Sequence, residues 1–284
     1  MDRRALLVGL ASLPLAGGSV SAAPGSARLA ALERDSGLHL GVAALNTASG
    51  ARIAHHADRR FAFCSTVKVI LAAAVLKRRA VEPALLARHV TVRDADLVAH
   101  SPITSGQVGG VMSVGDLCAA ALRYSDNAAG NLLIRVLGGP AAATAFAREI
   151  GDEVSRLDRL ETELNAAVPG DPRDTSTPAA MMDDLRRLAL GNGLDEAGRT
   201  TLLHWMLGNT TGARRIRAGV PPDWVVADKT GSGDFGTAND IAIAWPPGRP
   251  PVLIAIFTTH DTASAPWRED VIAAAAGIVA DAFR

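Results

Sequence analysis

The chain has 284 residues, 48% of them hydrophobic, with 29 Lys plus Arg balanced by 29 Asp plus Glu. This length and apolar content can fill one large domain or two interleaved lobes. A formal net charge of zero argues against nucleic acid or an anionic membrane as the main partner, because both require a basic excess.

The first 23 residues have the pattern of an export signal. Arg3 and Arg4 precede an apolar run over residues 5–15, and small residues follow through Ala23. The apolar run is too short to remain as a membrane anchor. We therefore predict a signal peptide over residues 1–23 and a periplasmic or secreted mature protein. The paired arginines leave the general and the twin-arginine export routes both open.

Strand patterns occupy both ends of the remaining chain, and helical patterns occupy its middle. The segments expected to be strands are residues 38–45, 53–56, 224–228, 241–245 and 252–259. The segments expected to be helices are residues 27–35, 67–76, 83–87, 114–124, 128–136, 140–150, 178–189, 194–207 and 267–283. This order predicts an α+β fold. A sheet lobe is formed by residues 24–62 with 209–284, an all-helical lobe of residues 63–208 is inserted, and the site lies between the lobes.

The cysteines and histidines offer little for redox or metal chemistry. Cys64 and Cys118 lie in apolar surroundings, so we expect buried, unpaired thiols. None of the seven histidines forms an H-x-H or H-x-x-x-H pair. The ligand set of a metal hydrolase is therefore not expected, nor is any cofactor.

Ser65 and Lys68 are the first candidates for chemistry. Ser65 lies where the Ala-rich buried helix should begin, and Lys68 follows three residues later on the same helix face. A lysine in so apolar a run is costly unless it has a partner. The pair suits a serine nucleophile with an amine beside it to move the proton. A single S-x-x-K motif, however, favours a helix-capping serine and a lysine that extends to water.

Two further short motifs carry polar groups of use in acyl transfer. Ser125 and Asn127 of S-D-N could relay a proton and bind a carbonyl group, or could merely cap the next helix. Lys229, Thr230 and Ser232 stand where a strand is expected to end. A cation beside two hydroxyls suits an anionic ligand and an oxyanion. The alternative is a solvated lysine at a strand exit.

A fourth motif lies between these two, in the segment RLETELN at residues 159–165. Glu161 on a loop can activate water if it is held in place, and Asn165 could position the same water. Ordinary surface charge explains most runs of this kind.

Each alternative is acceptable for one motif, but not for four motifs in this order. S-x-x-K, S-D-N and K-T-G together are typical of penicillin-interacting serine enzymes. The E-x-x-L-N element narrows the likeness to class A serine β-lactamases, which the chain resembles from about Ala27 to its C-terminus. The segments GNTTG at 208–212 and GTAND at 236–240 make it similar to the extended-spectrum and carbapenemase branches.

The resemblance implies a β-lactamase/transpeptidase-like fold with an antiparallel sheet of about five strands, and it implies catalytic roles. Ser65 is acylated, Lys68 shares in proton transfer, and Ser125 passes a proton to the departing lactam nitrogen. Glu161 activates the hydrolytic water. Either Lys68 or Glu161 could be the base for acylation.

The resemblance also implies positions that bind substrate or shape the site. The substrate-binding positions are Asn127, Asn165, Lys229, Thr230, Gly231 and Ser232. The backbone N–H groups of Ser65 and Ser232 form the oxyanion hole, and Arg159 and Asp174 form the ion pair that closes the omega loop.

The chain departs from the family pattern at three positions. The arginine that often follows K-T-G is missing, and Arg215 stands where some relatives place a substitute. His100 occupies the position of the usual aromatic residue at the mouth of the site. Thr162 replaces the proline that often follows the glutamate.

The activity expected from the resemblance is hydrolysis of penicillins and cephalosporins through an acyl-enzyme, which confers antibiotic resistance. The protein is expected to be a monomer whose partners are these small molecules. A penicillin-binding DD-peptidase and a penicillin-sensing module are the alternatives. Neither gives a reason for Glu161 and Asn165, and a sensor needs a membrane connection.

Overall fold

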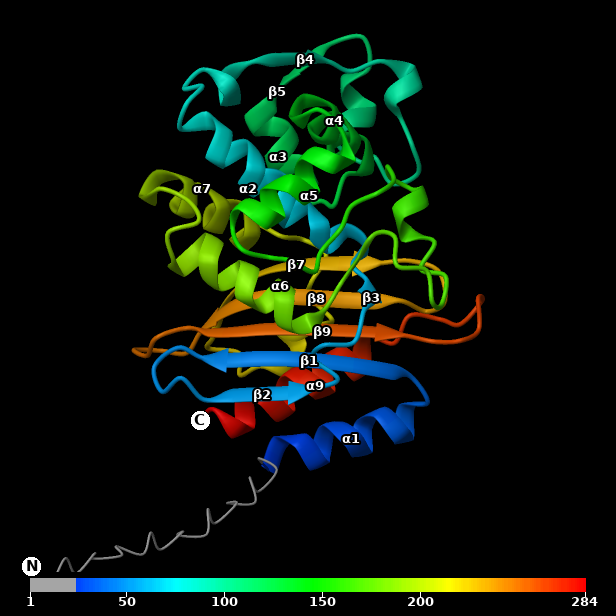
Figure 1. Ribbon diagram of the computed structural model, residues 1–284, viewed down its shortest axis with the longest axis vertical. Helices are drawn as coiled ribbons and strands as arrows, with labels where there is room; N and C mark the ends of the chain where they lie inside the picture. Colours follow the sequence, from blue (N-terminus) through cyan, green and yellow to red (C-terminus); the bar gives the residue numbers. More distant parts are fainter. Residues whose placement is uncertain (1–23) are drawn as a thin grey trace, which may run out of the picture.

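The computed structural model describes residues 24–284, so the signal peptide predicted over residues 1–23 lies outside the described part. A five-stranded antiparallel sheet runs across the molecule in the order β2-β1-β9-β8-β7 (Figure 1). Its strands are β1 (His39–Asn46), β2 (Arg52–His55), β7 (Val225–Ser232), β8 (Ala238–Trp245) and β9 (Val252–Thr259). The predicted α+β class, with strands from both ends of the chain, is confirmed.

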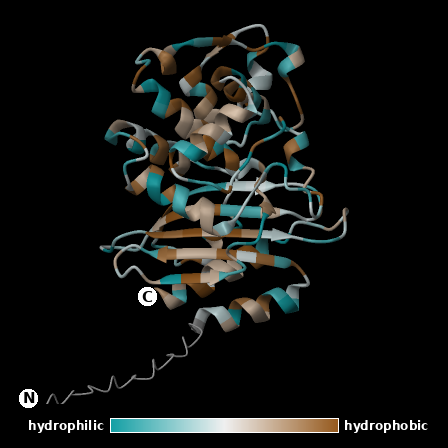
Figure 2. Cartoon of the chain, viewed as in Figure 1, coloured by the Kyte–Doolittle hydropathy of each residue, from teal (hydrophilic) through white to brown (hydrophobic). Residues whose placement is uncertain are grey.

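The sheet is covered on both faces, because successive side chains of its strands alternate between two cores. On β1, Leu40 and Val42 face one core and Ala43 and Leu45 face the other. In Figure 2, hydrophobic residues run along the central strand β9. Helices α1 (Pro24–Ser36), α8 (Ile216–Gly219) and α9 (Glu269–Ala282) contribute to the first core. Helix α6 (Pro178–Leu185) covers the opposite face.

The helical region is built around α2 (Lys68–Arg79), whose residues 68–76 are all buried. Four helices pack around it: α3 (Val114–Arg123), α4 (Asn127–Leu137), α5 (Pro140–Glu149) and α7 (Glu196–Leu207). A helix enclosed on all sides must be apolar all round, which explains the Ala-rich sequence.

Some elements differ from the expectation. Residues 83–87 contain only a 3₁₀ turn, and the helix expected over 178–189 ends at Leu185 and continues as a π-helical turn. Two small ribbons were not predicted: β3 (Phe61–Ala62) pairs with β6 (Thr175–Ser176), and β4 (His89–Thr91) with β5 (Val111–Ser113). Such short strands depend on distant partners rather than on their own pattern.

The strand that carries K-T-G is longer than expected. The sequence suggested that it ends at Asp228, but β7 continues to Ser232. Pairing with β8 through Ser232 and Ala238 holds it extended. Gly231 is required there, since a Cβ atom on it would lie 2.7 Å from the Phe63 carbonyl oxygen. Lys229, Thr230 and Ser232 are therefore edge-strand residues and not part of a strand exit.

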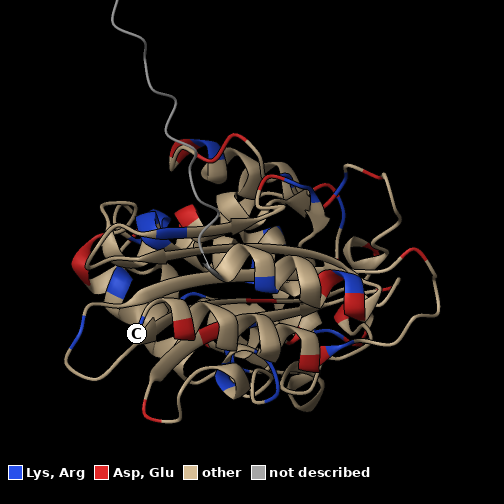
Figure 3. Cartoon of the chain, turned by 90° about the horizontal axis from the view of Figure 1, so that it is seen from below, with Lys and Arg blue, Asp and Glu red and all other residues tan. Residues whose placement is uncertain are grey.

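Cys64 and Cys118 are buried, unpaired thiols, as expected. Burial raises the pKa of both thiols far above the usual value. Within residues 24–284, the helices are all too short or too polar to cross a bilayer. Basic and acidic residues are interspersed along the chain in the view from below (Figure 3).

A pair of buried carboxylates ties the end of α5 to α6. Asp152 and Asp184 are 2% and 1% exposed, and each has one buried oxygen without a hydrogen-bond donor among residues 24–284. Burial, reinforced by the negative charge of Asp152, raises the pKa of Asp184 well above its usual value. The pKa of Asp152 is lowered, because hydrogen bonds to its carboxylate outweigh its own burial. These opposite shifts predict that a proton shared by the two carboxyl groups resides on Asp184, whose other oxygen pairs with Arg187 at 3.2 Å.

Replacing Asp184 by Asn should make the protein more stable at neutral pH. The pKa of Asp184 is higher in the folded protein than in the unfolded chain, where it is near 3.8. The stability that the shared proton contributes is therefore complete below pH 3.8 and is lost as the pH rises through the folded-state pKa. An amide donates to Asp152 at every pH, a gain of about 1–3 kcal/mol. Urea unfolding from pH 4 to 8 should show a gain that grows with pH. Asp183→Asn, in the exposed ion pair with Arg186, is the control; a pH-independent gain contradicts the shared proton.

Candidate active site

Ser65 lies in a short 3₁₀ turn, Cys64–Val67, that leads directly into α2. Its hydroxyl accepts a hydrogen bond from Lys68 Nζ at 2.9 Å and lies 3.2 Å from Glu161 Oε1, to which it can donate. Ser65 is 7% exposed and lines a cleft of about 370 Å³. An oriented hydroxyl between an amine and a carboxylate has the arrangement of an activated nucleophile.

Lys68 is fully buried and its charge is compensated by oxygen atoms. Its Nζ lies within 2.9 Å of Ser65 Oγ, the Ser125 carbonyl oxygen, Asn127 Oδ1 and Glu161 Oε1. The lysine therefore does not extend to water, as an S-x-x-K motif taken alone would suggest. Gly130 of α4 makes the space, because a Cβ atom there would lie 3.0 Å from Lys68 Cε.

The S-D-N motif brings a second hydroxyl and a second lysine into the cleft. Lys229 Nζ of β7 donates to Ser125 Oγ at 2.9 Å. Asp126 caps α4, because its side chain accepts a hydrogen bond from the Ala129 N–H. The helix cap is therefore Asp126, and Ser125 and Asn127 line the cleft instead. Burial, with the positive charge of Lys68 as the second cause, lowers the pKa of Lys229 well below its usual value. A weakly held proton beside Ser125 suits proton relay.

Glu161 is held from both its backbone and its side chain. The Asn131 side chain donates to the Glu161 carbonyl and accepts from its N–H, both at 2.8 Å. Asn165 Nδ2 donates to Glu161 Oε2. The Glu161–Thr162 peptide bond is cis. The carboxylate side chain is 1% exposed, so it is not the ordinary surface charge that the motif taken alone allowed.

The loop carrying Glu161 is closed by a network around Asp174. The Arg159 side chain donates to Asp174 Oδ2, and the N–H groups of Asp158 and Arg159 both donate to Asp174 Oδ1. Asp174 is fully buried. Three hydrogen bonds to one buried carboxylate fix the two ends of the loop to each other.

Arg215 lies beneath the K-T-G strand. Its guanidinium donates to Ser232 Oγ and to the carbonyl oxygens of Gly231 and Asn239, all at 2.7 Å, and pairs with Glu269. It is 3% exposed but lines the cleft beside Thr230 and Ser232. The structure thus puts a fixed positive charge next to the hydroxyls that the sequence assigned to an anionic group.

The rim of the cleft has one residue from the sequence prediction and one that it missed. His100 lines the cleft, and its Nε2 lies 3.0 Å from the Tyr124 carbonyl oxygen. Trp267 also lines the cleft, with 55% of its surface exposed, and its indole N–H donates to the Gly233 carbonyl. Trp267 thus supplies a large indole ring at the rim, whereas the His100 position offers only an imidazole.

The sequence also missed Asn131 and Thr211. Asn131 follows Asn127 by four residues on α4, and that helical spacing on one face could have pointed to it. Thr211 Oγ1 lies 2.5 Å from Thr230 Oγ1, a contact between segments that no local pattern predicts.

Comparison with known proteins gives a uniform result. The model of the beta-lactamase enzyme family matches residues 25–283. The chain is 54% identical to β-lactamase CTX-M-8 of Citrobacter amalonaticus, over 90% of this chain and 88% of that protein. It is 52% identical to β-lactamase CTX-M-25 of Escherichia coli, over 96% and 93%. The crystal structure of a β-lactamase from Desulfarculus baarsii is 55% identical, with a TM-score of 0.91 over 92% of this chain and 98% of that chain.

Proposed function

Because this chain belongs to the beta-lactamase enzyme family, we propose that Ser65, Lys68, Ser125 and Glu161 are the catalytic residues of its cleft. The protein is a class A serine β-lactamase: it hydrolyses the β-lactam ring and so confers antibiotic resistance. The named relatives give no support to a peptidase or a penicillin sensor. One observation above all supports the catalytic set: Lys68 and Glu161, both buried, converge on the Ser65 hydroxyl.

In the acylation half, Ser65 Oγ attacks the lactam carbonyl carbon and forms an ester as the C–N bond breaks. Its proton passes to Lys68 or Glu161, whose Nζ and Oε1 atoms lie 2.9 and 3.2 Å from the hydroxyl. The departing nitrogen takes a proton from Ser125, to which Lys229 donates. The net transfer is of the Ser65 proton to the nitrogen, so Lys68, Glu161 and Lys229 end the step in the protonation states in which they began it. The N–H groups of Ser65 and Ser232 bind the oxyanion.

In the deacylation half, Glu161 takes a proton from a water molecule that then attacks the ester carbonyl. Asn165 positions this water, as its amide already contacts Glu161 Oε2. Water attack releases the ring-opened acid and returns the proton to Ser65. This second half separates a β-lactamase from enzymes that remain acylated.

The remaining residues of the cleft bind the substrate. Asn127 binds the acylamide side chain, and Lys229, Thr230, Gly231 and Ser232 line the place of the carboxylate, with Arg215 behind them and His100 at the rim. Gly233 keeps the end of β7 close to the Glu161 loop, since a Cβ atom there would clash with the Asn165 carbonyl oxygen. Penicillins and oxyimino-cephalosporins are the expected substrates.

Steady-state hydrolysis of a panel of β-lactams by the purified protein tests this function. Penicillins and cephalosporins should be turned over many times per active site, and Ser65→Ala should abolish turnover without changing the thermal unfolding midpoint by more than a few degrees. A stoichiometric burst with no further hydrolysis by the wild type would favour the peptidase or the sensor.

Localisation, assembly and lobe division are further parts of the proposal. We infer cleavage near residue 23 and export to the periplasm or medium as a monomer that contacts neither nucleic acid nor membrane. The two lobes are residues 24–62 with 209–284 and residues 63–208, and the cleft between them needs residues from both: Ser65 and Ser125 from the second, Lys229 and Ser232 from the first.

Replacing Arg215 by Ala should raise KM for substrates that carry a carboxylate. Loss of a charge-assisted hydrogen bond costs about 1.5–3 kcal/mol, or about tenfold to a hundredfold in kcat/KM. Arg214→Ala is the matched control, because its side chain is 82% exposed and shares the Glu269 partner. Arg215→Lys should restore part of the loss. Equal kinetics for Arg215→Ala and Arg214→Ala would show that Arg215 only supports the strand.

A further inference from the structure

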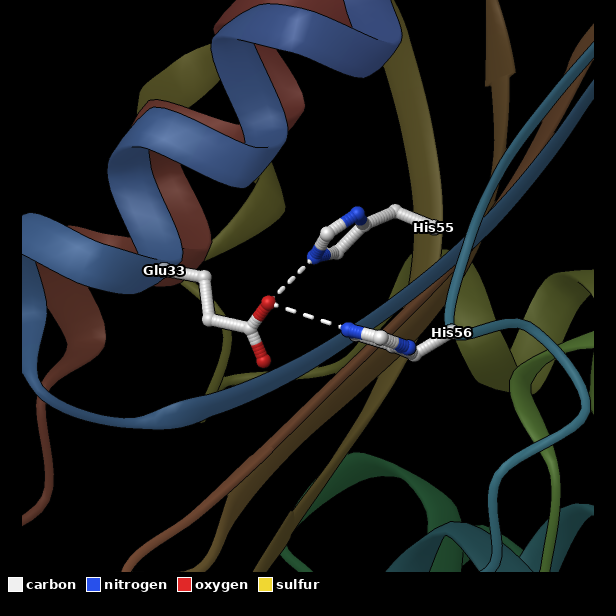
Figure 4. Close-up of side chains that lie close together, drawn as sticks. All are labelled: Glu33, His55 and His56. Atoms are coloured by element: carbon white, nitrogen blue, oxygen red, sulfur yellow. Dashed lines mark hydrogen bonds and ion pairs between the residues drawn. The ribbon is translucent and has the colours of Figure 1, made fainter.

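A cluster of three side chains lies at the edge of the sheet opposite to the active site. Glu33, in the last turns of α1, lies with its Oε2 atom 2.7 Å from His55 Nε2 and 3.2 Å from His56 Nε2 (Figure 4). His55 is the last residue of β2, and His56 follows it. One ligand-type atom from each residue lies within 4.8 Å of the others. The catalytic mechanism uses none of these residues.

Backbone geometry brings the two adjacent imidazoles to one carboxylate. Neighbouring side chains of a strand normally point to opposite faces. His56 has a φ of +42°, which interrupts the alternation as β2 ends. The two ring centroids consequently lie 4.4 Å apart, with the ring planes at 58°. Both Nε2 atoms point toward Glu33 in Figure 4.

The carboxylate is anchored and stays ionised. Glu33 Oε1 accepts a hydrogen bond from the Leu40 N–H at 3.0 Å, which leaves Oε2 for the histidines. Burial raises the pKa of Glu33, but the Leu40 hydrogen bond and the two histidines outweigh it and hold the pKa below its usual value. The Glu33 and His55 side chains are 18% and 11% exposed, whereas that of His56 is 52% exposed. Glu33 and His55 are thus held in place within the protein, and His56 leaves the cluster accessible to solvent.

We propose that Glu33, His55 and His56 bind a divalent first-row metal ion, with Zn²⁺ as the best fit. Two imidazole nitrogens and a carboxylate oxygen are zinc ligands, and a solvent molecule completes an open site. A tetrahedral ion with bonds of about 2.0–2.1 Å holds its ligand atoms about 3.3 Å apart. The two Glu33–histidine separations, 2.7 and 3.2 Å, need only a small expansion to reach that value.

Metal binding changes where the histidine protons lie. In the metal-free cluster, an Nε2–H group donates to the carboxylate. In the metal-bound site each Nε2 lone pair points to the ion, so each neutral imidazole carries its proton on Nδ1. The ion replaces hydrogen bonds between the same three residues and needs no other partner from the chain.

The ion would fasten α1 to the edge strand of the sheet. Glu33 is the ligand from α1, and His55 and His56 come from β2 and the residue after it. Four strand spacings separate β2 from β7, about 19 Å in all. Binding at this edge should stabilise the folded protein while leaving β-lactam hydrolysis unchanged.

Zinc titration of the tag-free protein tests the proposal. Calorimetry with zinc chloride should show one ion per chain, and a hundredfold excess over the dissociation constant should raise the unfolding midpoint by about 5 °C. His56→Ala, at the exposed ligand, should lose both effects and keep wild-type β-lactam turnover, which shows that it is folded. Glu33→Gln should weaken binding at least tenfold.

His39→Ala is the matched control. His39 also pairs with a carboxylate, that of Asp261 at 3.0 Å, but the Asp261 side chain is 74% exposed, and the pair belongs to no cluster of three ligand-type residues among those described. This variant should bind zinc like the wild type. Co²⁺ in place of Zn²⁺ should give the visible absorption of a four-coordinate ion, lost in His56→Ala. Absence of stoichiometric binding, or equal binding by His56→Ala and the wild type, would overturn the proposal.

Discussion

Replacing Glu161 by Ala should leave acylation in place and slow turnover of penicillins by about 10²–10⁴-fold, the usual contribution of a general base. In deacylation a base must lie within about 3 Å of the attacking water, and the Glu161 carboxylate is positioned by Asn131 and Asn165 for that task. Lys68 is its only close cationic partner among the described residues. The loss should therefore fall on kcat, with an initial burst of one β-lactam per enzyme.

Glu163→Ala is the matched control for this prediction. Glu163 lies two residues further along the same loop, but its side chain is exposed. Its replacement should leave kcat within about twofold, since most surface substitutions have small effects. If Glu161→Ala keeps wild-type turnover, another group is the deacylation base. If it loses the burst as well, Glu161 is also needed for acylation, which would decide between Glu161 and Lys68 as the first base.

Replacing Lys68 by Ala should reduce the rate of acylation by about 10²–10⁴-fold. The amine contacts the nucleophile and also compensates the buried Glu161 carboxylate. Its removal leaves Asn127 Oδ1 and the Ser125 carbonyl without this donor. Stopped-flow measurement should show that the acylation rate constant falls by this factor and that acylation, not deacylation, limits turnover.

Lys77→Ala, in the less buried last turn of the same helix, is the control for Lys68. Lys77 makes only a surface ion pair with Glu149, at 3.5 Å, so activity and stability should be nearly unchanged. Lys68→Ala should also lower stability, because Glu161 becomes a buried charge without its cation. Wild-type acylation by Lys68→Ala at neutral pH would assign proton transfer to Glu161 alone.

The parts of the site that the sequence predicts are those with short, local motifs. Ser65 and Lys68 are three residues apart on one helix face, and Lys229 to Ser232 are consecutive. Their chemical roles can therefore be predicted without knowledge of the tertiary structure. Composition and alternation likewise predict most helices and strands. The long helix α2 is recognisable because a fully enclosed helix leaves an unbroken apolar run.

The parts that the sequence does not predict depend on contacts between distant segments. Trp267 reaches the rim of the cleft only because α9 begins beside Gly233. The β3–β6 ribbon and the final residues of β7 are strands because of their partners. The Glu33 cluster joins residues of α1 and β2, and a search for spaced histidine pairs passes over two adjacent histidines.

Intact-protein mass spectrometry of Glu161→Ala after mixing with a penicillin is the most direct measurement for the central claim. The spectrum should show the protein plus one complete penicillin mass, persisting for minutes, and peptide mapping should place it on Ser65. Wild-type protein should show the adduct only transiently, and Ser65→Ala should show none. An adduct on another residue, or a lasting adduct on the wild type without turnover, would contradict hydrolysis through a Ser65 acyl-enzyme.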